Sequence, residues 1–93
     1  MKFCELTEIK EALDQRGIKY MERHYEGGAI VVWVSKLMQI ANPTEMQRKT
    51  FWPEVRITEH EGDAGYRVKC CGIIYEDQDI ENVMDLIDDY VLN

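Results

Sequence analysis

Apolar residues recur at helical spacing near both ends of the chain. Leu6, Ile9 and Leu13 form the first stripe, with acidic residues on the opposite side. Gly17 follows this stripe, and glycine readily takes the left-handed conformation that closes a helix. Ile18 follows Gly17, at the position whose side chain usually packs back against the last turns of the helix, here against Leu13. The pattern predicts an N-terminal helix over residues 5–16.

A second apolar stripe occupies the last part of the chain. Asp77 or Asp79 can cap a helix there, because an aspartate side chain accepts a hydrogen bond from the free backbone N–H groups of the first turn. The apolar face of this predicted C-terminal helix consists of Ile80, Val83, Met84, Ile87 and Val91.

Between the helices, β-branched and aromatic residues alternate with glycine-containing turns, which is typical of hairpins. We predict four strands, over residues 18–25, 29–35, 54–60 and 66–75, with a turn at 61–65 in the second hairpin. The second strand is apolar on both faces, which favours a central position with Trp33 in the core. Gly72 is expected to mark a bulge or a bend in the last strand.

The connection between the hairpins carries a helix-start pattern. Asn42 is expected to be the cap, Pro43 the first helical residue and Glu45 the residue that reaches back. A short helix to about Lys49 would follow. Pro53 then favours an extended path into the third strand.

The resulting order is α-β-β-(short α)-β-β-α. It predicts an α+β fold, in which a four-stranded, mainly antiparallel sheet of two hairpins carries the N- and C-terminal helices on one face. At 93 residues, we expect a single small domain over residues 1–93.

Negative charge is concentrated after Lys69. The chain has 11 Lys and Arg against 18 Asp and Glu, a net charge of −7, and no basic residue follows Lys69. Acids near a helix start are stabilising, whereas Asp85, Asp88 and Asp89 oppose the helix dipole. Asp85 and Asp89 are also a like-charge i,i+4 pair. The acids of this segment are Glu76, Asp77, Asp79, Glu81, Asp85, Asp88 and Asp89.

Two interpretations of this segment are open, a solubilising helix face and a docking surface for a basic protein partner. The functional hypothesis is a non-enzymatic interaction protein that binds a basic protein surface, because rows of carboxylates can occupy sites that hold nucleic-acid phosphates. Small acidic chains without catalytic motifs are typical of accessory proteins and inhibitors of phages and mobile elements. The expected contact residues are Asp77, Asp79, Glu81, Asp85, Asp88, Asp89, Phe51 and Trp52.

Phe51 and Trp52 stand beside Pro53 on the connection. Such a pair either plugs the open edge of the core, which we favour, or anchors a partner. Together with Val91 these aromatic residues could form a patch between two copies of the chain. The alternative function is therefore a homo-oligomeric adaptor or a chaperone-like scaffold, with a homodimer as its simplest form.

Direct nucleic-acid binding is a further hypothesis that the overall negative field disfavours. In this hypothesis, cations and an aromatic residue share the uncovered face of the sheet, as in other single-strand binders. The cations would be Lys19, Arg23, Arg56, Arg67 and Lys69, with Tyr25 or Tyr75 for stacking.

Enzymatic and metal sites have no support in the spacing of reactive residues. The cysteines and histidines show neither the paired spacing of zinc ligands nor a recognisable pair of nucleophile and base. They are Cys4, His24, His60, Cys70 and Cys71. Glycine-rich segments lack the Lys-Ser/Thr of a phosphate loop. We therefore expect no catalysis, no cofactor and no metal.

The cysteines are expected to be small buried or half-buried thiols in a reducing compartment. The first residues show no apolar leader, and the longest apolar run, residues 29–34, is too short to span a membrane. These features predict a cytoplasmic protein with no membrane association.

Overall fold

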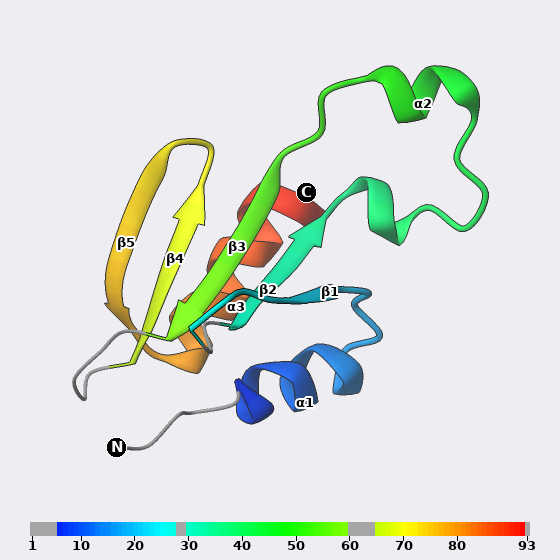
Figure 1. Ribbon diagram of the computed structural model, residues 1–93. Helices are drawn as coiled ribbons and strands as arrows, with labels where there is room; N and C mark the ends of the chain where they lie inside the picture. Colours follow the sequence, from blue (N-terminus) through cyan, green and yellow to red (C-terminus); the bar gives the residue numbers. More distant parts are fainter. Residues whose placement is uncertain (1–5, 28–29, 60–64, 93) are drawn as a thin grey trace.

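A single antiparallel sheet with helices on one face forms the body of the protein (Figure 1). The structure is a computed structural model that describes residues 6–27, 30–59 and 65–92. The sheet is a five-stranded meander in chain order, β1 (Met21–His24), β2 (Ile30–Ser35), β3 (Glu54–Glu59), β4 (Tyr66–Cys70) and β5 (Ile73–Gln78). The helical elements are α1 (Thr7–Gln15), η1 (Leu37–Gln39), α2 (Glu45–Lys49), α3 (Ile80–Ile87) and η2 (Asp88–Leu92). In the described ranges, no helix has the length and apolar character that crossing a membrane requires.

The predicted α+β class with an antiparallel sheet is confirmed, but the predicted number of strands is wrong. The segment 66–75, expected as one strand, folds back on itself so that Cys70 pairs with Ile73. Cys71 and Gly72 form the two-residue turn, with φ angles of 50° and 86°. Positive φ at both positions is the geometry that joins tightly paired antiparallel strands. Gly72 therefore belongs to a hairpin turn rather than to a bulge, and β5 is the additional strand.

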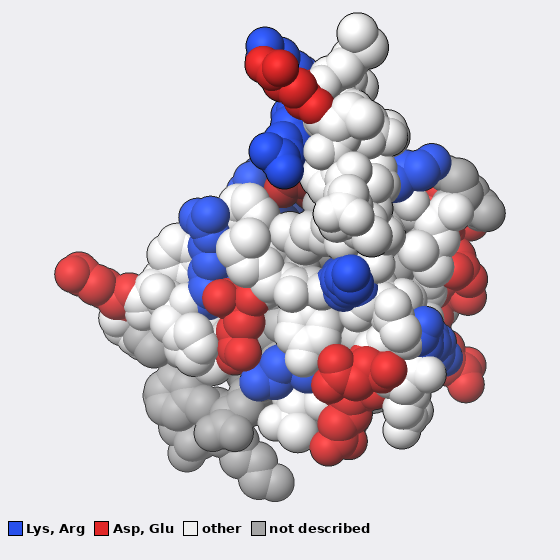
Figure 2. Space-filling model, turned by 90° about the vertical axis from the view of Figure 1, so that its right-hand side faces the viewer, with Lys and Arg blue, Asp and Glu red and all other residues white. Residues whose placement is uncertain are grey.

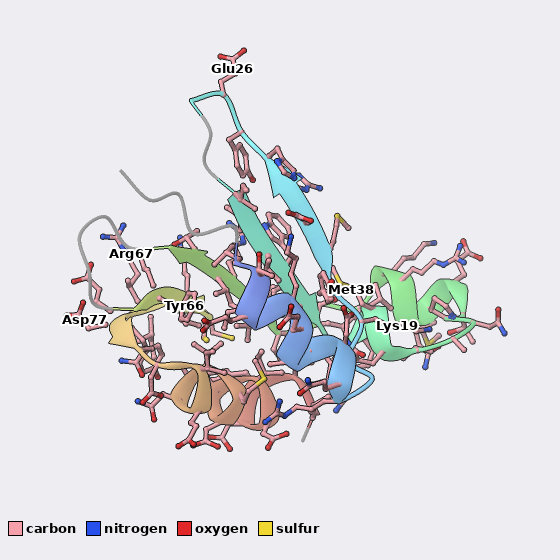
Figure 3. All side chains as sticks on the ribbon, turned by 90° about the horizontal axis from the view of Figure 1, so that it is seen from below. Lys19, Glu26, Met38, Tyr66, Arg67 and Asp77 are labelled. Carbon is pink, nitrogen blue, oxygen red and sulfur yellow. The ribbon has the colours of Figure 1, made fainter. Side chains whose placement is uncertain are left out.

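Both long helices cover the same face of the sheet, and Figure 3 shows them side by side beneath it. Alternation along the strands points every second side chain into this layer. The sheet contributes Val32, Val34, Val55, Ile57, Val68 and Cys70, all fully buried. The helices contribute Ile9 and Leu13 from α1 and Val83, Ile87 and Val91 from the C-terminal segment, also fully buried. The opposite face, called the outer face below, carries no helix of the described residues.

The end of α1 and the start of α3 agree with the ends predicted from the sequence. Gly17 has a φ of 67°, and the N–H of Ile18 donates to the carbonyl of Leu13 at 3.0 Å, which closes α1 as predicted. Asp79 caps α3 by accepting a bond from the N–H of Asn82 at 2.8 Å. Residues 1–5 and 60–64, which include parts of the predicted first helix and second turn, lie outside the described residues.

Residues 36–53 form a lobe, called the α2 lobe, that stands out from the sheet (Figure 2, top). Its helix begins two residues later than predicted. Thr44, rather than Asn42, is the cap, because its hydroxyl accepts from the N–H of Gln47 at 3.1 Å while the Gln47 side chain accepts from the N–H of Thr44 at 2.8 Å. This reciprocal pair satisfies two N–H groups at once, and Gln47 rather than Glu45 is the residue that reaches back.

Candidate binding surface on the outer face of the sheet

Trp33 lies on the outer face of β2 rather than in the core. Val32 and Val34 are fully buried, so alternation sends Val31 and Trp33 to the opposite side, where both are only half-buried. The predicted core position of Trp33 is therefore wrong, because helices cover only one face of the sheet. The strand is apolar on both faces for a different reason: its outer face lines a hollow.

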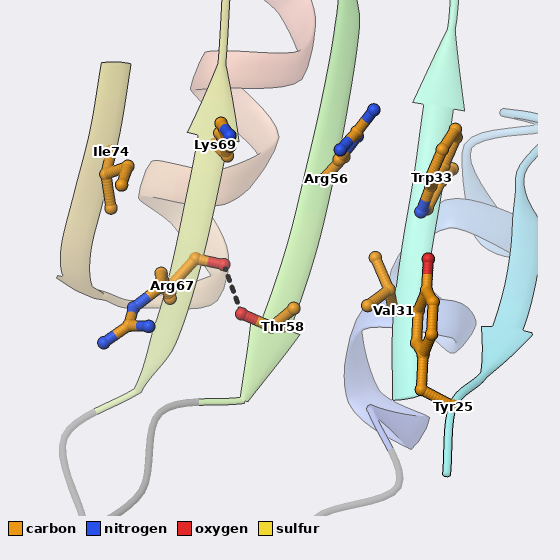
Figure 4. Close-up of a pocket in the computed structure, with 8 residues that line it drawn as sticks. All are labelled: Tyr25, Val31, Trp33, Arg56, Thr58, Arg67, Lys69 and Ile74. Carbon is orange, nitrogen blue, oxygen red and sulfur yellow. Dashed lines mark hydrogen bonds between the residues drawn. The ribbon is translucent and has the colours of Figure 1, made fainter. Parts of the chain in front are cut away.

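Antiparallel pairing gathers distant residues into two rows on the outer face (Figure 4). Directly paired residues in such a sheet lie on the same face, with Cβ atoms about 5 Å apart. One row contains Trp33, Arg56, Lys69 and Ile74. The other contains Arg23, Val31, Thr58 and Arg67. Cations from β1, β3 and β4 thus come together although they are far apart along the chain.

Trp33 is flanked by two guanidinium groups. The Arg23 and Arg56 guanidinium carbons lie 4.5 Å and 4.2 Å from the centroid of its ring. Each such contact is worth about 0.5–1 kcal/mol at an exposed site. Because Arg23 comes from β1 and Arg56 from β3, the ring holds cations from both neighbouring strands in place. The Nε1 atom of Trp33 is buried and has no hydrogen-bond partner within the described residues.

A shallow hollow of about 300 Å³ lies in the middle of the outer face. Figure 4 shows the hydroxyl end of Tyr25 pointing along the face toward Trp33, with Ile74 at the far side on β5. The Tyr25 and Ile74 side chains are 48% and 56% exposed, so apolar surface is accessible between the cations. The hollow is lined by Tyr25, Val31, Trp33, Arg56, Thr58, Arg67, Lys69 and Ile74.

Positive charge on the outer face is only partly neutralised. A loose ion pair joins Arg56 Nε to Glu54 at 3.8 Å, and Arg67 contacts Glu76 at 3.0 Å. In the described part of the chain, no carboxylate lies within ion-pair distance of Arg23 or Lys69. Exposed ion pairs contribute about 0–1 kcal/mol, so an incoming anion can displace them at small cost. The outer face therefore presents an excess of positive charge on a chain of net charge −7.

The predicted acidic contact residues lie on the other side of the molecule. Figure 3 shows carboxylates along the side of α3 that points away from the sheet. Among the described residues, no Lys or Arg is within ion-pair distance of them, and Asp79 serves as the helix cap. The helical acids thus form one exposed surface, called the α3 acidic surface, which consists of Asp79, Glu81, Asp85, Asp88 and Asp89. Asp77 is exposed on β5 and does not belong to it, contrary to the prediction that places it at the helix start.

Phe51 and Trp52 are on the α2 lobe, which stands apart from α3 in Figure 1. The expectation that this pair plugs the core is wrong for Phe51, whose side chain is 83% exposed. Trp52 is half-buried, and its Nε1 donates to the carbonyl of Gln47 at 2.6 Å, which ties it to the lobe. Val91 is fully buried, so it cannot join these aromatic residues in a surface patch.

The expectation that cations share the uncovered face is confirmed for most of its residues. The exceptions are Lys19, which precedes β1 and bonds through its backbone to the Gln39 side chain, and Tyr75, which packs against the core on the helix side. Figure 4 places Arg56, Arg67, Lys69 and Tyr25 together. The Tyr75 hydroxyl lies 3.1 Å from that of Tyr90, and this hydrogen bond raises the pKa of Tyr90 to about 12. Trp33 was not predicted from the sequence as a residue of this surface. The feature that could have indicated it is the alternation of Trp33 with the apolar residues Val32 and Val34 along β2.

Reactive side chains are dispersed in the described part of the molecule. No group of three or more His, Cys, Asp or Glu there is placed to hold a metal ion. His24 contacts Glu22 at 3.3 Å on β1. Cys70 is buried, and burial raises the pKa of its thiol to about 11, whereas Cys71 is exposed, contrary to the expected half-buried thiol. Cys4 and His60 lie outside the described residues.

Comparisons of the chain with models of protein families, with curated proteins and with solved structures find no significant match. The geometry of the outer face and of the α3 acidic surface therefore carries the functional argument that follows.

Proposed function

We propose that this protein is a non-enzymatic binding protein that holds a polyanion on the outer face of its sheet. The observation that carries this proposal is the convergence of Arg23 and Arg56 on Trp33, beside Arg67 and Lys69, on a face that none of the described helices covers. Guanidinium groups suit this task because their planar donors match phosphate and carboxylate oxygens. Their contact with one ring orders them before the ligand arrives, which lowers the entropy lost on binding.

The net negative charge of the chain does not prevent such binding. The α3 acidic surface lies beyond the helix layer, and a helix is about 10 Å thick. At physiological salt, charges separated by more than about 8 Å of solvent-accessible space are largely screened. An anion at the outer face therefore experiences mainly the nearby cations.

Binding of short-chain polyphosphate, measured by calorimetry at two salt concentrations, tests the proposal. Replacing Arg67 and Lys69 together with Ala should lower the affinity about tenfold or more and flatten its dependence on salt, because fewer counterions are displaced. The matched control replaces Arg48 and Lys49 with Ala, which removes the same charge from the α2 lobe. Equal losses in the two variants would contradict a site on the sheet, provided that both unfold at the wild-type temperature.

A second candidate function is docking of the α3 acidic surface onto a basic protein partner. It is supported by the exposure of carboxylates such as Asp85, Asp88 and Asp89. The burial of Val83 and Ile87, which packs α3 against the sheet, also supports it. A row of carboxylates on a rigid helix matches a groove that holds phosphates, as in an inhibitor that mimics nucleic acid.

Capture of partners from a host lysate tests this candidate. The variant with Asn at Asp85, Asp88 and Asp89 should fail to retain a basic partner that the wild type retains and that salt releases. Retention of the same partner by the variant would remove the α3 acidic surface as its binding site.

The alternative of a homo-oligomeric adaptor is supported by the α2 lobe, where Met46 and Phe51 are 79% and 83% exposed. If these side chains join two copies, Phe51→Ser should shift sedimentation from dimer to monomer. A wild-type protein that sediments as a monomer at tens of micromolar would remove this alternative.

A further inference from the structure

We infer that the polyanion is a single-stranded nucleic acid whose bases contact the apolar part of the outer face, an inference that rests on the proposed function. The geometry that points to it is the mixing of apolar and cationic side chains on one surface. Val31 and Ile74 lie directly in the rows that contain Arg56, Arg67 and Lys69. A ligand that fills this face must offer flat apolar groups and negative charges at similarly short spacing.

Single-stranded nucleic acid has this composition, because unpaired bases are free to lie on a protein surface while their phosphates meet cations. The exposed ring of Tyr25 offers one stacking surface beside the hollow. The guanidinium groups of Arg23 and Arg56 offer others, since a guanidinium group that lies over Trp33 on one side can stack on a base with its other side. Both neighbours of the Trp33 ring thus extend its aromatic surface outward.

The indole N–H of Trp33 adds a donor to the same hollow. Within the described part of the chain its Nε1 is buried without a hydrogen-bond partner, and burial of an unpaired N–H is destabilising. A phosphate or base oxygen that enters between Trp33 and Tyr25 would relieve that cost. The hollow of about 300 Å³ is large enough for one nucleobase with its attached groups.

Other polyanions match this face less well. A duplex keeps its bases paired, so it would present phosphates and leave Val31, Ile74 and Tyr25 uncovered. The α3 acidic surface of a second copy has complementary charge, but the apolar residues Val83 and Ile87 of that helix are fully buried in its own core. A second copy would therefore meet the cations without filling the apolar part of the hollow.

The test compares a fluorescein-labelled oligothymidylate of about 12 nucleotides with an abasic oligomer of the same length. Fluorescence anisotropy of the full chain should show at least tenfold tighter binding of the oligothymidylate, because stacking of bases on aromatic surfaces adds to the phosphate contacts. Tyr25→Ala and Ile74→Ser should abolish most of that difference, because they weaken binding of the oligothymidylate much more than binding of the abasic oligomer. Met46→Ser, which removes an exposed apolar side chain from the α2 lobe, is the matched control.

The outcomes separate the two proposals. Equal binding of the two oligomers would overturn the inference about bases and leave polyanion binding in place. Binding of neither oligomer, and none of polyphosphate, would overturn both proposals. If the protein then self-associates, and replacement of either Arg67 and Lys69 or Asp85 and Asp88 by Ala disperses it, the occupant of the outer face is the α3 acidic surface of a second copy.

Discussion

Arg56 lies over the ring of Trp33, with its guanidinium carbon 4.2 Å from the ring centroid, and the two residues are direct partners across β2 and β3. The pair explains how a bulky aromatic residue remains on a face that the described helices leave uncovered. The ring is shielded by arginines instead of by core residues, and the arginines are ordered by the ring in return. Half-burial of Trp33 is therefore a property of the binding surface and not of the hydrophobic core.

We predict that Trp33→Phe leaves the free energy of unfolding within about 1 kcal/mol of wild type. The smaller ring buries less apolar area, but the substitution also removes a buried N–H that has no partner among the described residues, and these effects oppose each other. Trp52→Phe is the control, because its N–H bonds to the Gln47 carbonyl and its loss should cost about 0.5–1.5 kcal/mol. Urea unfolding measures both, and a loss of several kcal/mol in Trp33→Phe would instead indicate a core residue.

The packing of α3 against the sheet can be tested at Ile87. Its side chain is fully buried, so Ile87→Ala should lower the free energy of unfolding by about 2–5 kcal/mol, a large part of the stability of a small domain. Leu92, nearby in η2, is 43% exposed, and Leu92→Ala should cost much less. Thermal unfolding followed by circular dichroism distinguishes the two. Similar losses would mean that the C-terminal segment is packed differently.

The turn between β4 and β5 gives a stabilising prediction. Cys71 has a φ of 50°, which is unfavourable for most side chains, and it precedes Gly72. Asn-Gly is the preferred pair for this turn, so Cys71→Asn should raise the free energy of unfolding by about 0.5–1 kcal/mol. Gly72→Ala should lower it, because the φ of 86° disfavours a Cβ although nothing else lies within contact distance. If Gly72→Ala were neutral, the two-residue turn would be wrong.

Stability should fall at alkaline pH through Cys70. Burial, followed by the neighbouring Cys71, raises the pKa of the Cys70 thiol from 9.0 to about 11. Below pH 9 the thiol is protonated in both the folded and the unfolded chain, so this contribution to stability is fully present. Between pH 9 and about 11 the unfolded chain releases the proton while the folded chain retains it, which favours unfolding.

The decline can be measured from urea midpoints across this pH range. Cys70→Ala should be less stable than wild type at neutral pH but should lose stability less steeply above pH 9. The same slope in both proteins would show that other groups, such as the Tyr75 and Tyr90 pair, cause the decline.

The elements of the fold could be predicted from the sequence wherever interactions between residues close together in the chain determine them. Gly17 ends α1, Asp79 caps α3, and the apolar stripe that includes Val83 and Ile87 is the buried face of that helix. These features depend on residues within a turn or two of each other. The fifth strand was missed because Gly72 is compatible with both a bulge and a hairpin turn, and only the positive φ of its neighbour Cys71 separates them.

The candidate site was less accessible, because it depends on pairing between strands. The pattern around Trp33 shows that both faces of β2 are apolar, but it does not show which of them the helices cover, and Trp33 was therefore placed in the core. The rows that join Arg56 and Lys69 to Trp33 follow from strand register, which no single segment specifies. Glu81, Asp85, Asp88 and Asp89 could be located because they lie on consecutive turns of one helical segment.

A titration of ¹⁵N-labelled protein with the oligothymidylate, followed by amide and indole N–H chemical shifts, tests the central claim most directly. We predict that the Trp33 indole N–H shifts strongly, together with the amides of Arg56 and Lys69, while the Trp52 indole and residues 80–92 change little. Shifts concentrated in residues 80–92, or equal shifts of both indoles, would contradict a binding surface on the outer face of the sheet.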